Sequence, residues 1–355
     1  CKVWINLHGK MLLRNIFVLK QMGKLPKELL ENVDNIDEDL FSEFTPIDIF
    51  EYVSNNSLIK LNLKITMENL TLNLKLVSKK KLRNKEINNI IKRICLLYLL
   101  KHKNDKQYSN ISLTIIFTNA KKSLPKEYKV LGTREVNSGL ASFGDNKILI
   151  YRNEEYSKLL IHELIHLYRI DFSVINIDFL PKLLDINNDT KTIPNESITE
   201  ILAVIINCII VSIEFSKKKN TKLATDLINY EISFNLFQCS KILNHFGYNY
   251  AHDFFRPNNG ESIFEQTTSV VSYFFIKTAC LFNTPKLLEF LNNNFTELNY
   301  DNLEEAKKNY VSLVEESLQN KTFHEQIDYI MEAIEESKHY TFFYNNLRMT
   351  CIEIE

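Results

Sequence analysis

The stretch KILIYRNEEYSKLLIHELIH, residues 147–166, contains the transition on which the fold depends. Its first five residues form a short apolar run that is typical of a buried strand. Asn153 follows as a candidate N-cap, and Glu154 and Glu155 supply the acidic charge that the first turn of a helix favours. From residue 156 onward the apolar residues have helical spacing. We therefore predict a strand over 147–151 that leads directly into a helix.

Toward the N-terminus the chain reads as strands with one intervening helix. Residues 136–143 and 147–151 flank the turn Gly144-Asp145-Asn146, which is typical of a hairpin. The short apolar run 113–117 predicts another buried strand.

Further upstream, two stretches alternate apolar and polar residues with a period of two, 59–65 and 70–76. This pattern predicts two half-buried strands joined by a short turn. A helix over 85–103 follows, with its isoleucines on one face. Together these elements predict a small mixed sheet with a helix packed behind it.

The C-terminal half reads almost entirely as helix from residue 196 onward. The chain has only 7 Gly and 7 Pro, too few turn formers for an all-β sandwich or barrel. We therefore expect an α+β fold that is mostly helical. We divide it into an N-terminal helical or irregular segment (1–57), a sheet-containing subdomain that ends with the helix capped by Asn153 (58–172), and a helical C-terminal subdomain (173–355).

Composition excludes several classes of function. The 43 Lys and Arg balance 44 Asp and Glu, so we expect no nucleic-acid partner, which would favour a strongly basic chain. Neither GxxxxGK[ST] nor GxGxxG occurs, which removes the main support for a P-loop or a dinucleotide site. The longest apolar run, 201–215, has 15 residues, and a membrane span needs about 20. We therefore expect a buried core helix there and no membrane span.

The six cysteines are scattered and form no CxxC pair. This usage favours a reducing compartment, although an even count leaves disulfides possible. We expect an intracellular protein, with a secreted or virion-associated one as the alternative.

His162-Glu163-Leu164-Ile165-His166 is an HExxH sequence within the predicted helix. Histidines at i and i+4 lie on one helix face, so both imidazoles can reach a single ion. Glu163 lies beside them, where it can take a proton from a water on that ion. Neutral imidazoles suit Zn²⁺, which needs at least one more ligand and an open position. The alternative is a helix with two partly exposed histidines.

Asn195-Glu196-Ser197-Ile198-Thr199-Glu200 opens the next apolar helix and offers that ligand. Glu196 and Glu200 are one turn apart on the same face. One can bind the ion while the other accepts a hydrogen bond from a ligand histidine. The alternative is that both are ordinary first-turn acids stabilised by the helix dipole.

These two motifs together resemble the zincin metalloproteases and, among them, the gluzincins. The gluzincin hallmark is HExxH on one helix and NExxSD on the next, and here Thr199 and Glu200 stand in place of Ser and Asp. The resemblance covers roughly residues 110–215. It implies a zincin-like catalytic core and one Zn²⁺ per chain held by His162, His166 and Glu196, with Glu200 contacting a ligand histidine.

The resemblance leaves the third ligand open in two respects. Glu196 follows His166 by 30 positions, a longer gap than in thermolysin-like enzymes, so Glu200 competes for the role. An aspartate between the motifs is a further alternative, from Asp171, Asp178 or Asp185. The metzincins are excluded, because Arg169 stands where they have glycine and Phe172 where they have their third histidine.

The gluzincin resemblance also implies that the strand over 136–143 is the sheet edge that pairs with an extended substrate. Gly139, Leu140 and Ala141 are then substrate-binding residues, and small side chains at 139 and 141 leave that edge uncluttered. The alternative is an ordinary hairpin strand.

Hydrolysis also needs a donor for the developing oxyanion. The segment 244–252 concentrates suitable side chains, and we predict catalytic roles for Tyr250 and His252 ahead of the other candidates. Those other candidates are His245, Tyr248, Tyr168, Arg169 and Tyr273.

The predicted function is a zinc-dependent metallopeptidase that acts on a protein or peptide, with Glu163 as general base. Two other classes stay open: an inactive zincin-fold scaffold, and a helical interaction protein with a chance HExxH. The sequence does not indicate the oligomeric state.

Overall fold

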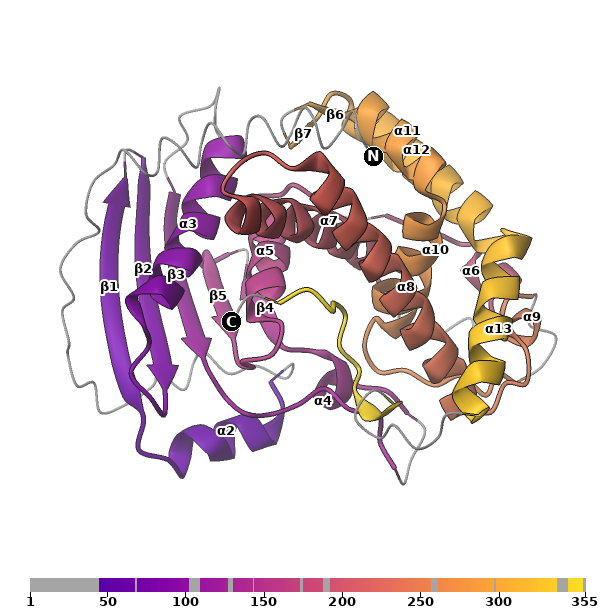
Figure 1. The fold of residues 1–355 in the computed structure, drawn as a ribbon, viewed down its shortest axis with the longest axis horizontal. Coiled ribbons are helices and arrows are strands. Elements are labelled where there is room, and N and C mark those ends of the chain that lie inside the picture. The colour runs from indigo at the N-terminus through magenta and orange to yellow at the C-terminus, as the bar shows by residue number, and fades with distance from the viewer. Residues whose placement is uncertain are drawn as a thin grey trace.

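The computed structural model describes residues 45–67, 69–101, 109–126, 130–142, 144–172, 175–187, 192–256, 261–296, 298–336 and 344–353. Of the predicted N-terminal segment, residues 1–44 therefore lie outside the described part. Figure 1 shows a sheet on one side of the molecule and a helical region on the other, with helices α5 and α7 between them. This arrangement confirms an α+β fold that is mostly helical, with a mixed sheet that precedes a helical C-terminal region.

The two alternating stretches form the predicted strand pair. Strands β1 (Ile59–Met67) and β2 (Leu70–Ser78) are antiparallel, with Leu63 opposite Leu74. The leucines of β2 at alternate positions are buried, so the period of two in the sequence reports one buried face.

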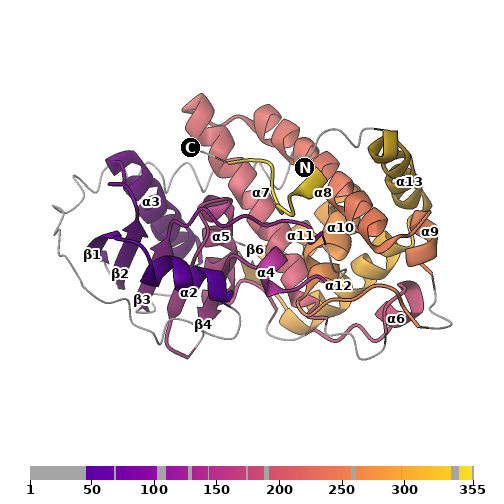
Figure 2. The same cartoon turned by 90° about the horizontal axis from the view of Figure 1, so that it is seen from below.

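The sheet has five strands in the order β1-β2-β3-β5-β4. Strand β3 (Ser109–Ile116) runs parallel to both β2 and β5. Helix α3 (Asn84–Lys101) makes the crossover from β2 to β3, and its predicted isoleucine face is buried. Helix α2 (Ile47–Ser54) packs on the opposite face of the sheet, and Figure 2 shows α3 and α2 on the two sides of the strands.

The predicted hairpin is present but shorter than expected. Strand β4 (Gly139–Ser142) pairs antiparallel with β5 (Lys147–Ile150) and lies at the edge of the sheet. Of the predicted strand over 136–143, Val136 instead ends the short helix α4 (Thr133–Val136), in which Glu135 Oε2 accepts a hydrogen bond from Gly132 N at 3.0 Å, and Phe143 lies outside the described residues.

Helix α5 (Tyr156–Leu167) carries the HExxH sequence and is buried over nearly its whole length. Its N-cap is Glu155, in the left-handed conformation (φ 61°), so the prediction of Asn153 as the cap is wrong. The Glu155 carboxylate does not cap α5. It lies 2.9 Å from Lys122 Nζ and binds backbone N–H groups of the C-terminal segment.

Helix α7 (Asn195–Ser216) packs along α5 and is the central helix of the C-terminal half. By length and composition it could cross a membrane, but 89% of its most apolar window is buried inside the protein. This burial matches the prediction of a core helix.

The other helices of the C-terminal half complete this region. They are α6 (Leu180–Leu183), α8 (Thr221–Phe246), α9 (Ala251–Phe254), the π-helix η2 (Val271–Ile276), α10 (Lys277–Phe282), α11 (Thr284–Asn294), α12 (Leu303–Leu318) and α13 (Lys321–Glu336). A two-stranded sheet, β6 (Phe295–Thr296) with β7 (Asn299–Tyr300), joins α11 to α12. The C-terminal segment over 344–353, drawn yellow in Figure 1, begins with helical residues at 344–345, and Asn346 then forms an isolated bridge with Ser123.

Candidate metal centre

Helices α5 and α7 bring three donor atoms into a small triangle. His162 Nε2 and His166 Nε2 lie 3.1 Å apart, and Glu196 Oε2 lies 3.3 Å from each. The i, i+4 spacing on α5 aligns the two rings, and Glu196 reaches them from the first turn of α7. The predicted ligand set therefore comes together from two helices.

The triangle fits a metal ion. Bonds of about 2.0–2.2 Å in a tetrahedral site place neighbouring ligand atoms about 3.3–3.5 Å apart. The observed separations are close to that value, and no other group of three His, Cys, Asp or Glu among the described residues meets the same test. The group is nearly buried, and Glu196, with 15% of its side chain exposed, is its most accessible member.

The ring nitrogens that face away from the triangle each contact a carboxylate. His162 Nδ1 lies 2.8 Å from Glu200 Oε1, and His166 Nδ1 lies 2.6 Å from Asp171 Oδ2. Thr199 Oγ1 donates to Asp171 Oδ2 at 3.1 Å. Such partners fix the orientation and tautomer of a ligand histidine. Glu200 thus has the predicted orienting position, on the far side of the His162 ring from the triangle.

Asp171 has a role that sequence reasoning missed. We considered it only as an alternative ligand, whereas it orients His166. Of the other two aspartates considered, Asp178 is exposed, and Asp185 accepts a hydrogen bond from Tyr248 at 2.7 Å.

The electrostatics of the centre favour charged carboxylates around protonated histidines. Burial lowers the pKa of His166, but Glu196 and Asp171 outweigh it and raise that pKa well above its usual range. The pKa of His162 is also raised, because the hydrogen bonds that its ring donates to Glu196 and Glu200 outweigh burial. Burial raises the pKa of Glu196, but the two histidines lower it further, so the net shift is downward. A cation in the triangle would take the place of these protons.

Glu163 lies between the centre and the edge strand. Its side chain is buried, and a Cβ built on Gly139 of β4 would lie 3.2 Å from Glu163 Oε1. Burial raises the pKa of Glu163, and the neighbouring histidines lower it by less. The absence of a side chain at residue 139 therefore leaves room for this carboxylate beside β4.

Tyr273 is the aromatic hydroxyl residue that the structure brings to the centre. Its ring centroid is 6.3 Å from that of His162, and it lies in the π-helix η2. Burial raises the pKa of Tyr273 well above its usual range, and the charges of Glu196, Glu163 and Glu200 raise it further. Single π-turns occur frequently at functional sites.

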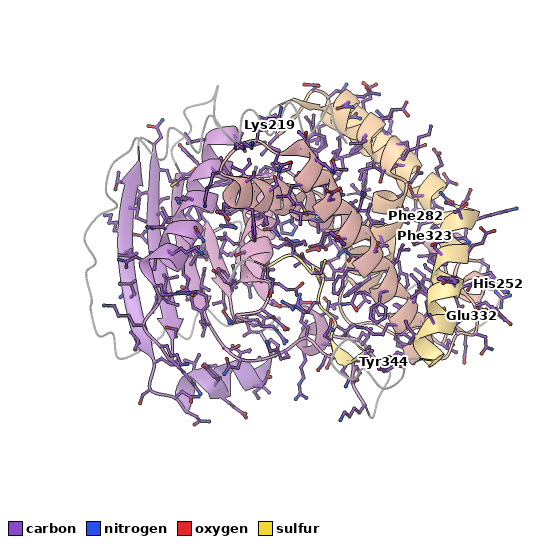
Figure 3. The ribbon with its side chains drawn as sticks, in the orientation of Figure 1. Lys219, His252, Phe282, Phe323, Glu332 and Tyr344 are labelled. Carbon is purple, nitrogen blue, oxygen red and sulfur yellow. The ribbon has the colours of Figure 1, made fainter. Side chains whose placement is uncertain are left out.

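Tyr250 and His252, for which we predicted catalytic roles, are not among the residues that the structure brings to the centre. Their rings stack on each other in and beside α9, and both are exposed (Tyr250 53%, His252 side chain 62%). Figure 3 places His252 at the outer edge of the helical region, whereas α5 lies at the middle of the molecule in Figure 1.

The remaining candidates lie elsewhere. Tyr248 binds Asp185, and His245 packs edge-on against Phe246 at the end of α8. Tyr168 is buried against Tyr98, and Arg169 is exposed beyond the C-terminus of α5.

Comparison with known proteins identifies one distant relative. The chain is 27% identical over 212 residues to a curated protein of Acanthamoeba polyphaga mimivirus, named "Uncharacterized protein R210". The match covers 58% of this chain and 51% of that protein, so the chain spans about half the length of its curated relative. No family model and no solved structure matches the chain.

Proposed function

We propose that the protein is a zinc-dependent metallopeptidase of the zincin type. The observation that carries the proposal is the triangle of His162, His166 and Glu196 with the Glu163 carboxylate between it and strand β4, the last strand of the sheet among the described residues. A metal centre, a base and a strand that can bind an extended backbone are the parts that peptide hydrolysis requires.

Zinc suits this donor set best. Two neutral imidazoles and one carboxylate, with no thiolate, form a three-ligand set typical of catalytic zinc sites, which keep a further position open. A zinc ion at such a centre supplies a Lewis acid and lowers the pKa of the attacking water.

Glu163 acts as the general base in this proposal. Its raised pKa brings the carboxyl group closer to neutral pH, which suits a group that first accepts a proton from water and then delivers it to the leaving amine. Glu163 contributes none of the three donor atoms of the triangle, so its carboxylate is available to accept and deliver these protons.

Strand β4 orients the substrate and Tyr273 stabilises the transition state. The outer edge of β4 offers main-chain groups at Gly139, Leu140 and Ala141, all half-buried, to an extended peptide. Tyr273 lies on the His162 side of the centre and offers a phenolic O–H to the developing oxyanion.

The test is a mixed peptide library incubated with zinc-loaded protein, with products identified by mass spectrometry. Wild type should cleave peptides, and Glu163→Gln should lose at least about 10³-fold in rate while it still binds one zinc ion. Glu305→Gln, an exposed glutamate in α12, is the matched control and should cleave like wild type. Zinc uptake with no cleavage by wild type would contradict the peptidase and favour an inactive scaffold.

A further inference from the structure

A cluster of buried charges surrounds the outer side of the metal centre. It contains three lysines and three glutamates, each with at most 2% of its surface exposed: Lys122, Lys158, Lys277, Glu155, Glu200 and Glu231. Buried charges are costly unless they are paired, and removing one partner typically destabilises a protein by several kcal/mol. Each member should therefore have a defined partner.

Several of those partners belong to the C-terminal segment, residues 344–353. Glu155 Oε1 accepts hydrogen bonds from the backbone N–H of Met349 at 2.5 Å and of Thr350 at 2.7 Å. Glu231 Oε1 accepts from the backbone N–H of Ile352 at 3.0 Å. The segment is therefore held by charges that would be buried and partly unpaired without it.

Lys277 connects this segment to the metal centre. Its Nζ donates to the carbonyl of Met349 at 3.1 Å and lies 3.3 Å from Glu200 Oε2. The other carboxylate oxygen of Glu200 lies 2.5 Å from Lys158 Nζ and 2.8 Å from His162 Nδ1. Each carboxylate oxygen of Glu200 is thus held by one lysine, Oε1 by Lys158 and Oε2 by Lys277. The position of this carboxylate sets the orientation of the His162 ring.

We infer that Lys277 is a positioning residue that makes the metal centre depend on the C-terminal segment. By binding Met349 and Glu200 at once, it holds the Glu200 carboxylate against His162 and so keeps Nε2 of that ring in the triangle. The inference rests on the proposed metal site, and it adds that residues 344–353 are part of that site although they provide no ligand.

The structure offers a matched control in Lys241. This lysine is also buried, and its Nζ also donates to a carbonyl of the C-terminal segment, that of Asn346. The two differ in that Lys277 contacts Glu200. Lys277→Met and Lys241→Met therefore both loosen the segment, whereas only the first removes a partner of Glu200.

The first experiment measures zinc affinity by competition with a chromogenic chelator. Lys277→Met should bind zinc about 10-fold more weakly than wild type, at the low end of the range for outer partners of metal ligands. Lys241→Met should bind like wild type. In a double-mutant cycle, Lys277→Met should weaken binding little further in a Glu200→Gln background, because both act through one carboxylate. Equal effects of the two lysine variants, or full additivity with Glu200→Gln, would overturn the inference.

A second experiment uses wild-type protein alone, so it does not depend on the variants folding. Coupling between two sites is reciprocal, so zinc should slow amide hydrogen exchange in peptides that cover 349–352 more than in the β1–β2 pair. Equal slowing in both regions would overturn the inference. The proposed function fails separately, when zinc-loaded wild type cleaves no peptide, and such a protein would still show the zinc affinities and hydrogen exchange described here.

Discussion

At the residue scale, the centre depends on what each histidine contacts on its outer side. Glu200 was predictable, because its spacing from Glu196 places it one turn along the same helix face. Asp171 was not, because Arg169 adopts a left-handed conformation (φ 52°) beyond the end of α5 and redirects the chain. That turn brings Asp171 back to His166. The helical spacing of the sequence does not predict such a turn.

Asp171→Asn should shift the pH dependence of zinc binding. Protons compete with the metal for His166, so affinity falls as the pH drops through the pKa of that histidine. Asp171 helps to raise this pKa, so in the variant the fall should begin at lower pH. Because an outer partner is weakened as well, affinity above that range should drop by about 10–100-fold.

The measurement is zinc affinity over a pH series wide enough to contain the whole fall in affinity of the wild type. Asp178→Asn, an exposed aspartate in the same loop, is the control and should follow wild type. A profile for Asp171→Asn that overlies that of wild type would show that Asp171 does not act on His166.

Tyr273→Phe should separate catalysis from metal binding. Loss of one oxyanion donor typically costs about 10²–10³-fold in kcat, and the phenyl ring preserves the packing beside His162. We expect this loss in kcat, with KM and zinc content unchanged, in steady-state assays on a cleaved library peptide. An unchanged kcat would remove Tyr273 from the mechanism.

At the scale of elements, the edge strand was predicted in place and order but not in length. The turn at 144–146 indicated the hairpin, whereas the short helix α4, which takes Val136 out of the predicted strand, has no signal in that pattern. Only Gly139 to Ser142 remain to form β4. The strand is thus just long enough to pass Glu163.

Gly139→Ala should disturb β4 and the carboxylate beside it. The added Cβ would lie 2.8 Å from the Leu149 carbonyl oxygen and 3.2 Å from Glu163 Oε1, so the strand must shift. We expect stability to fall by about 1–3 kcal/mol and peptidase activity to fall with it.

Gly144→Ala is the matched control in the same hairpin, because a Cβ there meets nothing within 4 Å. Urea unfolding and a cleavage assay on both variants test the comparison. If Gly139→Ala behaved like Gly144→Ala in both assays, β4 would have no close relation to Glu163.

At the scale of the whole molecule, local periodicity predicted the order of elements, and long-range packing decided the rest. Helix α8 has 26 residues and is about 39 Å long. The direction in which it runs therefore decides how far from the metal centre the residues after it lie. That direction takes Tyr250 and His252 to the outer edge of the helical region and brings Tyr273 of η2 to the centre. The return of residues 344–353 across the buried charges is likewise set by pairing between distant segments.

Metal content measured by elemental analysis tests the central claim most directly. Wild type should contain about one zinc ion per chain, and His162→Ala should contain none. His252→Ala, which alters an exposed histidine remote from the triangle, should keep the full amount. Wild-type protein that takes up no zinc when zinc is supplied, or a His162→Ala variant that retains it, would contradict the account.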